Sequence, residues 1–130
     1  MKEINKFIYK TVLFLLLSFS VQAQDMVLKI GVSDAKITVK VFSSLTCPHC
    51  ASFHGEIFNN LKKDFIDKGL VKFEHHAFPL DLAALNASKL AHCENNGSSD
   101  FLHTLYKNQE TWKKGNNILE INNNLKKACR

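Results

Sequence analysis

The stretch KITVKVFSSLTCPHCASFH, residues 36–54, changes its hydrophobic period halfway along and carries two cysteines at the change. Ile37, Val39 and Val41 alternate with polar residues, which is the period-two pattern of a β-strand. From Pro48 onward apolar residues recur every four positions, as on one face of an amphipathic helix. The stretch therefore predicts a strand that runs directly into a helix, with the cysteines at the junction.

The flanking segments extend this pattern to a βαβ unit. The segment LVKFEHHAF, residues 70–78, alternates again, and MVLKIGV, residues 26–32, is a weaker strand candidate. The helix between the strands is expected to end at Gly69, because glycine is the usual residue just past a helix C-terminus. A strand, a helix and a strand in this order predict a parallel pair.

The first helix is expected to be amphipathic, with an apolar stripe and Phe58 beside it. Beyond Pro79 the spacing turns helical in three further segments, and Asn117 is placed to cap the last of them. The stripe consists of Phe53, Ile57, Leu61 and Phe65, and the later helical segments are residues 80–93, 99–112 and 116–129.

Residues 1–23 have the features of a secretory signal peptide. A lysine-rich start precedes an apolar run, Val12–Val21, and small residues follow at positions 21 and 23. A membrane-spanning helix needs about 20 apolar residues, so cleavage before Gln24 is favoured over a membrane anchor facing the periplasm. Lysine outnumbers arginine sixteen to one, a composition typical of AT-rich bacterial genomes. Export of a bacterial chain predicts a periplasmic protein, in a compartment where disulfides persist.

The charge balance excludes one class of partner. The whole chain carries +5, and removing residues 1–23 takes away three lysines and Glu3, which leaves +3. This modest, evenly spread excess does not predict a nucleic-acid surface.

The spacing of Cys47 and Cys50 fits a zinc site, a haem attachment, a structural bridge or a working dithiol. Haem attachment needs a histidine at position 51, where the chain has Ala51. Zinc needs a second pair of ligands at suitable spacing, and Cys93 and Cys129 are isolated. A bridge that closes so short a loop stabilises little. A redox dithiol is therefore favoured, with no metal and no cofactor.

The strand-to-helix junction assigns a role to each motif residue. Cys47 falls at the helix N-terminus, and Pro48 suits the first turn because its missing N–H would be unpaired there anyway. Free backbone N–H groups and the helix dipole should lower the pKa of Cys47. His49 can add a positive charge or a hydrogen-bond donor. Cys50, one turn later, points inward, so Cys47 attacks and Cys50 resolves.

The segments FSSLTCPHCASFH, VKFEHHAFPLD, LAHCENN and LYKNQETW together resemble bacterial DsbA-type thiol:disulfide oxidoreductases. The resemblance implies an α/β fold with a thioredoxin-like βαβ part (24–79) and a helical insertion (80–130), and with the C-terminal strands of the fold missing. It implies that the Cys47–Cys50 disulfide passes to exported proteins with reduced cysteines. A membrane quinone-linked reoxidase would then restore it. Pro48 and His49 would tune the pair.

Other readings stay open beside this one. The family's later cis-proline has no counterpart, since the chain contains only Pro48 and Pro79. An isomerase or reductase, an inactive fragment, and a non-enzymatic or metal-handling remnant are therefore the alternatives. The resemblance also implies a structural disulfide between Cys93 and Cys129. Taken alone, Cys93 is expected to be a buried small residue.

Overall fold

The computed structural model describes residues 27–93 and 100–128, and the expected signal peptide lies outside them. Within the described residues three strands form one sheet with β3 in the middle, in the order β1-β3-β2. β3 pairs in parallel with β2 and antiparallel with β1, so the expected strands and the expected parallel pair are confirmed. The strands are β1 (Val27–Ile30), β2 (Ile37–Ser43) and β3 (Val71–Ala77).

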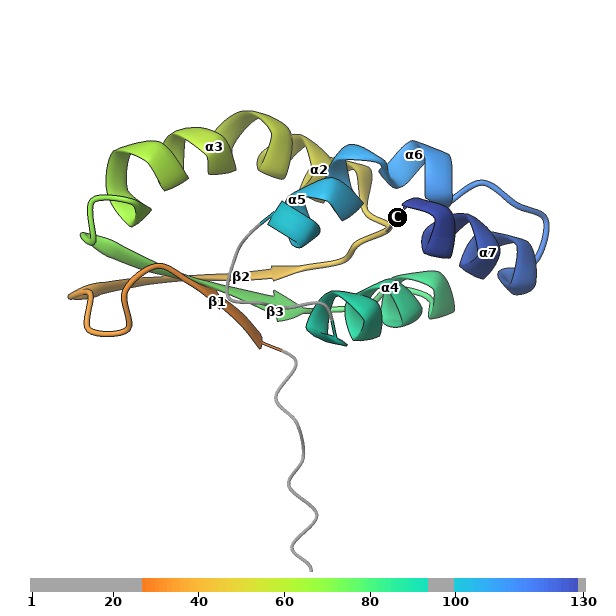
Figure 1. The fold of residues 1–130 in the computed structure, drawn as a ribbon, viewed down its shortest axis with the longest axis horizontal. Helices are drawn as coiled ribbons and strands as arrows, with labels where there is room; N and C mark the ends of the chain where they lie inside the picture. The colour runs from red at the N-terminus through yellow and green to blue at the C-terminus, as the bar shows by residue number, and fades with distance from the viewer. Residues whose placement is uncertain (1–26, 94–99, 129–130) are drawn as a thin grey trace, which may run out of the picture.

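The expected helix between β2 and β3 is one long rod that lies along the sheet (Figure 1). Gly69 ends it with a φ of +72°, a conformation that glycine adopts without strain. The Gly69 N–H donates to the Ile66 carbonyl at 2.9 Å, and the Leu70 N–H donates to the Phe65 carbonyl at 3.0 Å. The rod alternates ordinary and wider π-helical turns: α2 (Pro48–Ser52), η1 (Phe53–Ile57), α3 (Phe58–Leu61) and η2 (Lys62–Ile66).

The expected apolar stripe is confirmed at Phe53 and Leu61, which are partly buried and pack against the core, and is wrong at Ile57 and Phe65, which are 56% and 48% exposed. The buried side chains of the helix are Phe58, which the sequence placed beside the stripe, and His54 and Ile66, which it did not. In an α-helix of about 3.6 residues per turn, residues four apart drift around the axis, and wider turns keep them in line. His54 and Phe58 are buried because they face the Phe73 ring of the sheet. The distance between ring centroids is 6.2 Å for His54 and Phe73, and 4.8 Å for Phe58 and Phe73.

The chain after β3 is helical, as expected. Asn117 caps the last helix, since its Oδ1 accepts from the Glu120 N–H at 3.0 Å. None of the helices in the described ranges combines the length and the apolar character needed to cross a bilayer. The helices are α4 (Leu82–Cys93), α5 (Asp100–Lys107), α6 (Gln109–Trp112) and α7 (Ile118–Ala128).

These helices gather toward the end of the sheet where β2 and β3 finish (Figure 1). The core runs from the sheet into this helical cluster, and its fully buried large side chains include Phe58, Phe73, Leu105 and Trp112. The β2–α2 connection lies between the two parts. Residues from both halves of the chain therefore converge on the CPHC motif.

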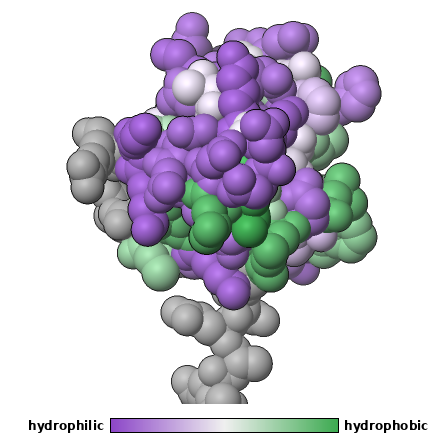
Figure 2. Space-filling view, turned by 90° about the vertical axis from the view of Figure 1, so that its right-hand side faces the viewer, coloured by the Kyte–Doolittle hydropathy of each residue, from purple (hydrophilic) through white to green (hydrophobic). Residues whose placement is uncertain are grey.

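Apolar side chains also remain exposed at this end of the molecule. Figure 2 looks onto it and shows a largely hydrophilic surface with apolar residues gathered along its lower part. Phe42 is the residue before the end of β2, Phe78 follows β3, Leu80 precedes α4 and Leu82 begins it, and each is more than half exposed. These residues lie on the segments that flank the motif.

Candidate active site

The connection from β2 to α2 is buried up to the motif itself. Ser44, Leu45 and Thr46 are buried, and Cys47 is the first partly exposed residue. Cys47 has extended backbone angles (φ −80°, ψ 120°) and stands at the N-cap of α2. Its carbonyl accepts the first helical hydrogen bond, from the Ala51 N–H at 3.2 Å. The sequence thus places the Cys47 sulfur over the unpaired amides that open the helix.

Several donors lower the pKa of Cys47. The largest effect is a hydrogen bond from the Cys50 thiol, followed by the backbone N–H of Cys50. The backbone N–H of His49 and the positive charge of Lys113 add to them, while partial burial acts in the opposite direction. The thiolate is the nucleophilic form of cysteine, so this environment makes Cys47 the reactive member of the pair.

Cys50 has the opposite environment. Burial raises its pKa, and its side chain packs against the hydrophobic core. Its thiol also donates to Cys47, which further favours the protonated form of Cys50. The two thiols therefore have pKa values that are shifted in opposite directions.

Pro48 and His49 are both exposed at the start of α2. Pro48 occupies the first helical turn, as expected from its missing N–H. His49 acts on Cys47 through its backbone N–H, and the positive charge that acts on the sulfur comes from Lys113. Sequence reasoning missed Lys113 because it lies 66 positions after Cys47 in the chain.

Two side chains from later helices hold the β2–α2 connection. The Gln109 Nε2 group donates to the Leu45 carbonyl at 2.8 Å and to the Cys47 carbonyl at 3.0 Å. On the other side, the Thr46 hydroxyl donates to Asp81 Oδ2 at 2.7 Å. Asp81 Oδ1 accepts from the Ala84 N–H at 2.7 Å, so it also caps α4.

A buried polar cluster lies behind the motif. The Tyr106 hydroxyl makes hydrogen bonds with Ser43 Oγ at 2.8 Å and with His75 Nε2 at 3.0 Å. His54 stacks on the Tyr106 ring, with 4.0 Å between centroids. Burial lowers the pKa of His54 to about 3 and that of His75 to about 4, so both imidazoles are neutral at pH 7.

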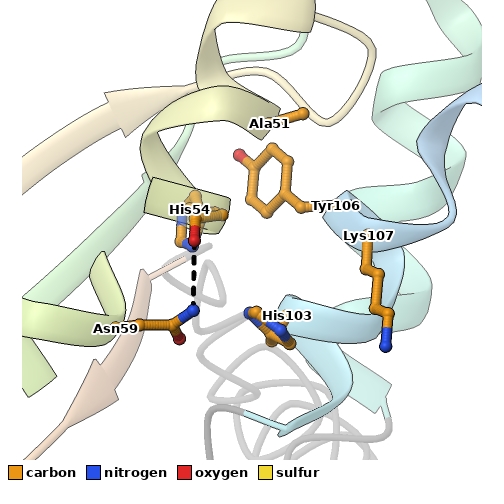
Figure 3. Close-up of a pocket in the computed structure, with 7 residues that line it drawn as sticks. Ala51, His54, Asn59, His103, Tyr106 and Lys107 are labelled. Atoms are coloured by element: carbon orange, nitrogen blue, oxygen red, sulfur yellow. Dashed lines mark hydrogen bonds between the residues drawn. The ribbon is translucent and has the colours of Figure 1, made fainter. Parts of the chain in front are cut away.

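The cluster borders a pocket of about 230 Å³ between the long helix and α5 (Figure 3). His54 of the long helix lines one side of the pocket, and His103, Tyr106 and Lys107 of α5 line the other. The Asn59 amide donates to the Gly55 carbonyl at 3.2 Å, the dashed line in Figure 3. Across residues 27–93 and 100–128, no three His, Cys, Asp or Glu side chains come together as metal ligands would.

The prediction of a buried Cys93 is wrong, since Cys93 is an exposed free thiol at the end of α4. It lines an open cleft between α4 and α7. Cys129 lies outside the described residues. The expected pairing of these two cysteines stays a prediction.

Known proteins are similar to the chain in both sequence and fold. A family model described as thioredoxin matches residues 22–129. A Rickettsia bellii protein provisionally named protein-disulfide oxidoreductase is 36% identical over 106 residues, covering 80% of this chain and 40% of that protein. Disulfide bond formation protein D of Bacillus subtilis is 36% identical over 85 residues, covering 62% of this chain and 38% of that protein. The chain thus spans about two fifths of the length of these relatives.

Two solved structures show the same arrangement of helices and strands. Oxidised BdbD from Bacillus subtilis is 30% identical with a TM-score of 0.58, and the match covers 69% of this chain and 53% of that one. Alpha-DsbA1 from Wolbachia pipientis is 24% identical with a TM-score of 0.64, over 84% of this chain and 65% of that one. The expected thioredoxin-like fold, with a small sheet and several helices, is confirmed.

Proposed function

The chain belongs to the thioredoxin family, and we propose that it is a periplasmic protein-disulfide oxidoreductase that oxidises exported proteins through Cys47 and Cys50. The observation that carries the proposal is the asymmetry of the two sulfurs. The amides that open α2 and the Cys50 thiol lower the pKa of Cys47, whereas burial raises that of Cys50. The Cys47 sulfur is therefore suited to be attacked and to act as a leaving group, and the Cys50 sulfur is suited to stay protonated in the reduced pair.

The oxidised form carries a bond between the two sulfurs. A substrate thiolate attacks Cys47, the bond to Cys50 breaks, and the electron pair stays on Cys50, which takes up a proton. A second substrate thiolate then attacks the substrate sulfur of the mixed disulfide and releases Cys47 as a thiolate. The substrate gains a disulfide, and the pair has accepted two electrons.

Stabilising the Cys47 thiolate favours the reduced form of the pair. A dithiol that prefers its reduced form gives its disulfide away readily, which is why DsbA, with a thiol pKa of about 3.5, is a strong oxidant. The donors around Cys47 act in this direction. We therefore favour an oxidase over the alternative of an isomerase or reductase.

The substrates we propose are exported proteins that still contain reduced cysteines. Unfolded chains expose apolar side chains, and Phe42, Phe78 and Leu80 offer apolar surface beside the motif. The secretory signal expected in residues 1–23 would place the protein in the periplasm. A membrane quinone-linked reoxidase would take the two electrons and restore the disulfide.

The remaining sequence-based expectations belong to the same proposal. Residues 24–79 form its thioredoxin-like part and residues 80–130 its helical part. A disulfide between Cys93 and Cys129 would brace the helical part. Thiol counting on the oxidised, unfolded protein tests it, because two free thiols beyond the Cys47–Cys50 pair would exclude the second bridge.

The test of the function is an equilibrium with glutathione, followed by transfer to a reduced, unfolded protein. An oxidase should show a potential near that of DsbA, about −120 mV, and a reductase one near that of thioredoxin, about −270 mV. The oxidised protein should form a disulfide in the reduced substrate, and the Cys47→Ser variant should not. Failure of the wild-type protein to exchange with either partner would support the inactive-fragment alternative and overturn the proposal.

A further inference from the structure

Gln109 makes the longest-range hydrogen bonds to the catalytic connection. Its Nε2 group donates to the carbonyls of Leu45 and Cys47, which lie 64 and 62 positions earlier in the chain. The side chain is only 2% exposed. One side-chain amide thus binds both the buried connection before α2 and the reactive cysteine itself.

These two bonds act at the point where the backbone changes conformation. Cys47 is extended, whereas Pro48 already belongs to the helix. The direction of the Cys47 carbonyl depends on the ψ angle of Cys47, and the same angle decides how its side chain stands over the amides of α2. A donor fixed on that carbonyl therefore restricts the position of the sulfur.

The cost of keeping Gln109 in place argues against a simple packing role. Its Oε1 atom is buried and has no hydrogen-bond partner among the described residues. A buried polar atom without a partner destabilises a fold, and an apolar side chain of the same length would avoid that loss. The unpaired oxygen is understandable if the two donated bonds serve the site.

We propose that Gln109 is a positioning residue that sets the reactivity of Cys47 by clamping the carbonyls of Leu45 and Cys47. The inference rests on the proposed exchange reaction, because it names a residue that prepares the same sulfur for it. The clamp is itself anchored, since the Lys113 N–H donates to the Gln109 carbonyl at 3.0 Å. α6 therefore brings both the clamp and the Lys113 charge to the motif.

The test compares Gln109→Met with a matched control on the same helix, Trp112→Phe. Methionine has a similar length but cannot donate a hydrogen bond. Trp112→Phe also removes a buried donor to a backbone carbonyl, because Trp112 Nε1 donates to the Leu105 carbonyl at 2.8 Å, away from the motif. Both variants should unfold more easily than the wild type.

The discriminating readout is the acid dependence of Cys47 alkylation in the reduced protein. Gln109→Met should raise the Cys47 ionisation midpoint by about one pH unit, a tenfold loss of thiolate at acidic pH. Trp112→Phe should leave the midpoint unchanged. Equal midpoints in Gln109→Met and the wild type, or equal shifts in both variants, would overturn the proposal.

A measurement on the wild-type protein covers the case in which Gln109→Met does not fold. The side-chain NH₂ resonances of Gln109 should titrate with the same midpoint as Cys47, while those of Asn86, which donates to Asn122 at 3.0 Å, should not. If the Gln109 NH₂ resonances did not change with pH, the proposed positioning role of Gln109 would be overturned. A wild-type Cys47 midpoint equal to that of free cysteine would instead overturn the proposed function.

Discussion

The replacement His54→Phe tests the buried cluster behind the motif. His54 is fully buried, and neither of its ring nitrogens has a hydrogen-bond partner within residues 27–93 and 100–128. Its ring is surrounded by those of Phe58, Phe73 and Tyr106. Burial lowers the pKa of His54 to about 3, and burial likewise lowers that of His75 to about 4.

The sign of the acid effect follows from these pKa values. An unfolded histidine ionises near pH 6.5, so between pH 6.5 and the folded pKa only the unfolded chain takes up the proton. The stability that the protein gains from keeping these two histidines neutral is fully present well above pH 6.5 and is lost as the pH falls toward 4. The loss is about 1.4 kcal/mol per pH unit and per histidine. Between pH 6.5 and 5, His54 and His75 together should cost about 3 kcal/mol of unfolding free energy, about 1.6 kcal/mol from each, because the slope is only half its full value at pH 6.5.

Phenylalanine fills the same aromatic site without a titrating group. The variant should be at least as stable as the wild type at pH 7, because no hydrogen bond is lost. Its loss of stability between pH 6.5 and 5 should fall to about 1.6 kcal/mol. Urea unfolding of the reduced protein at several pH values measures both quantities.

The exposed Asn60 on the same long helix provides the control, since Asn60→Gln changes no titrating group and should keep the full acid sensitivity of the wild type. The reasoning would be refuted if His54→Phe lost as much stability on acidification as the wild type. A wild type whose stability did not change between pH 6.5 and 5 would refute it equally.

Three further replacements probe the site. In Cys50→Ser the Cys47 thiolate should attack the disulfide of an oxidised peptide, release one peptide thiolate and stay joined to the other sulfur, because no second thiol follows to resolve the bond; the mixed disulfide is visible on non-reducing gels, and free turnover would assign resolution elsewhere. Asp81→Ala removes two short hydrogen bonds and should cost about 2–4 kcal/mol in urea unfolding, against less than about 0.5 kcal/mol for the exposed Asp64→Ala; equal losses would contradict its bracing role. Lys113→Gln should slow alkylation of Cys47 at acidic pH about two- to fivefold. An unchanged rate would show that the Lys113 charge does not stabilise the Cys47 thiolate.

The strands and the long helix were predictable because each has a local period. Ile37, Val39 and Val41 alternate as expected in β2, and Gly69 ends the helix where the sequence placed the stop. The junction at Cys47 followed from the same change of period. Local pattern and turn chemistry agree over this part of the chain.

The phase of the helix and the supports of the site could not be predicted in this way. Two four-residue series, starting at Phe53 and at His54, compete for the core, and the π turns and the Phe73 ring decide between them. Gln109 and Asp81 reach the motif only through the tertiary fold. A lone glutamine or aspartate carries no periodic signal, so its partner 35 or 64 positions away is invisible in the sequence.

The account depends most directly on the ionisation of Cys47. The measurement is a pH titration of thiolate absorbance in the reduced protein, with Cys47→Ser as the blank that identifies the signal. The account predicts a Cys47 midpoint below about 8.5, the value of an unperturbed cysteine, and a Cys50 midpoint above it. A Cys47 midpoint at or above that value would contradict the account, because the amides of α2 would then not be stabilising the sulfur anion.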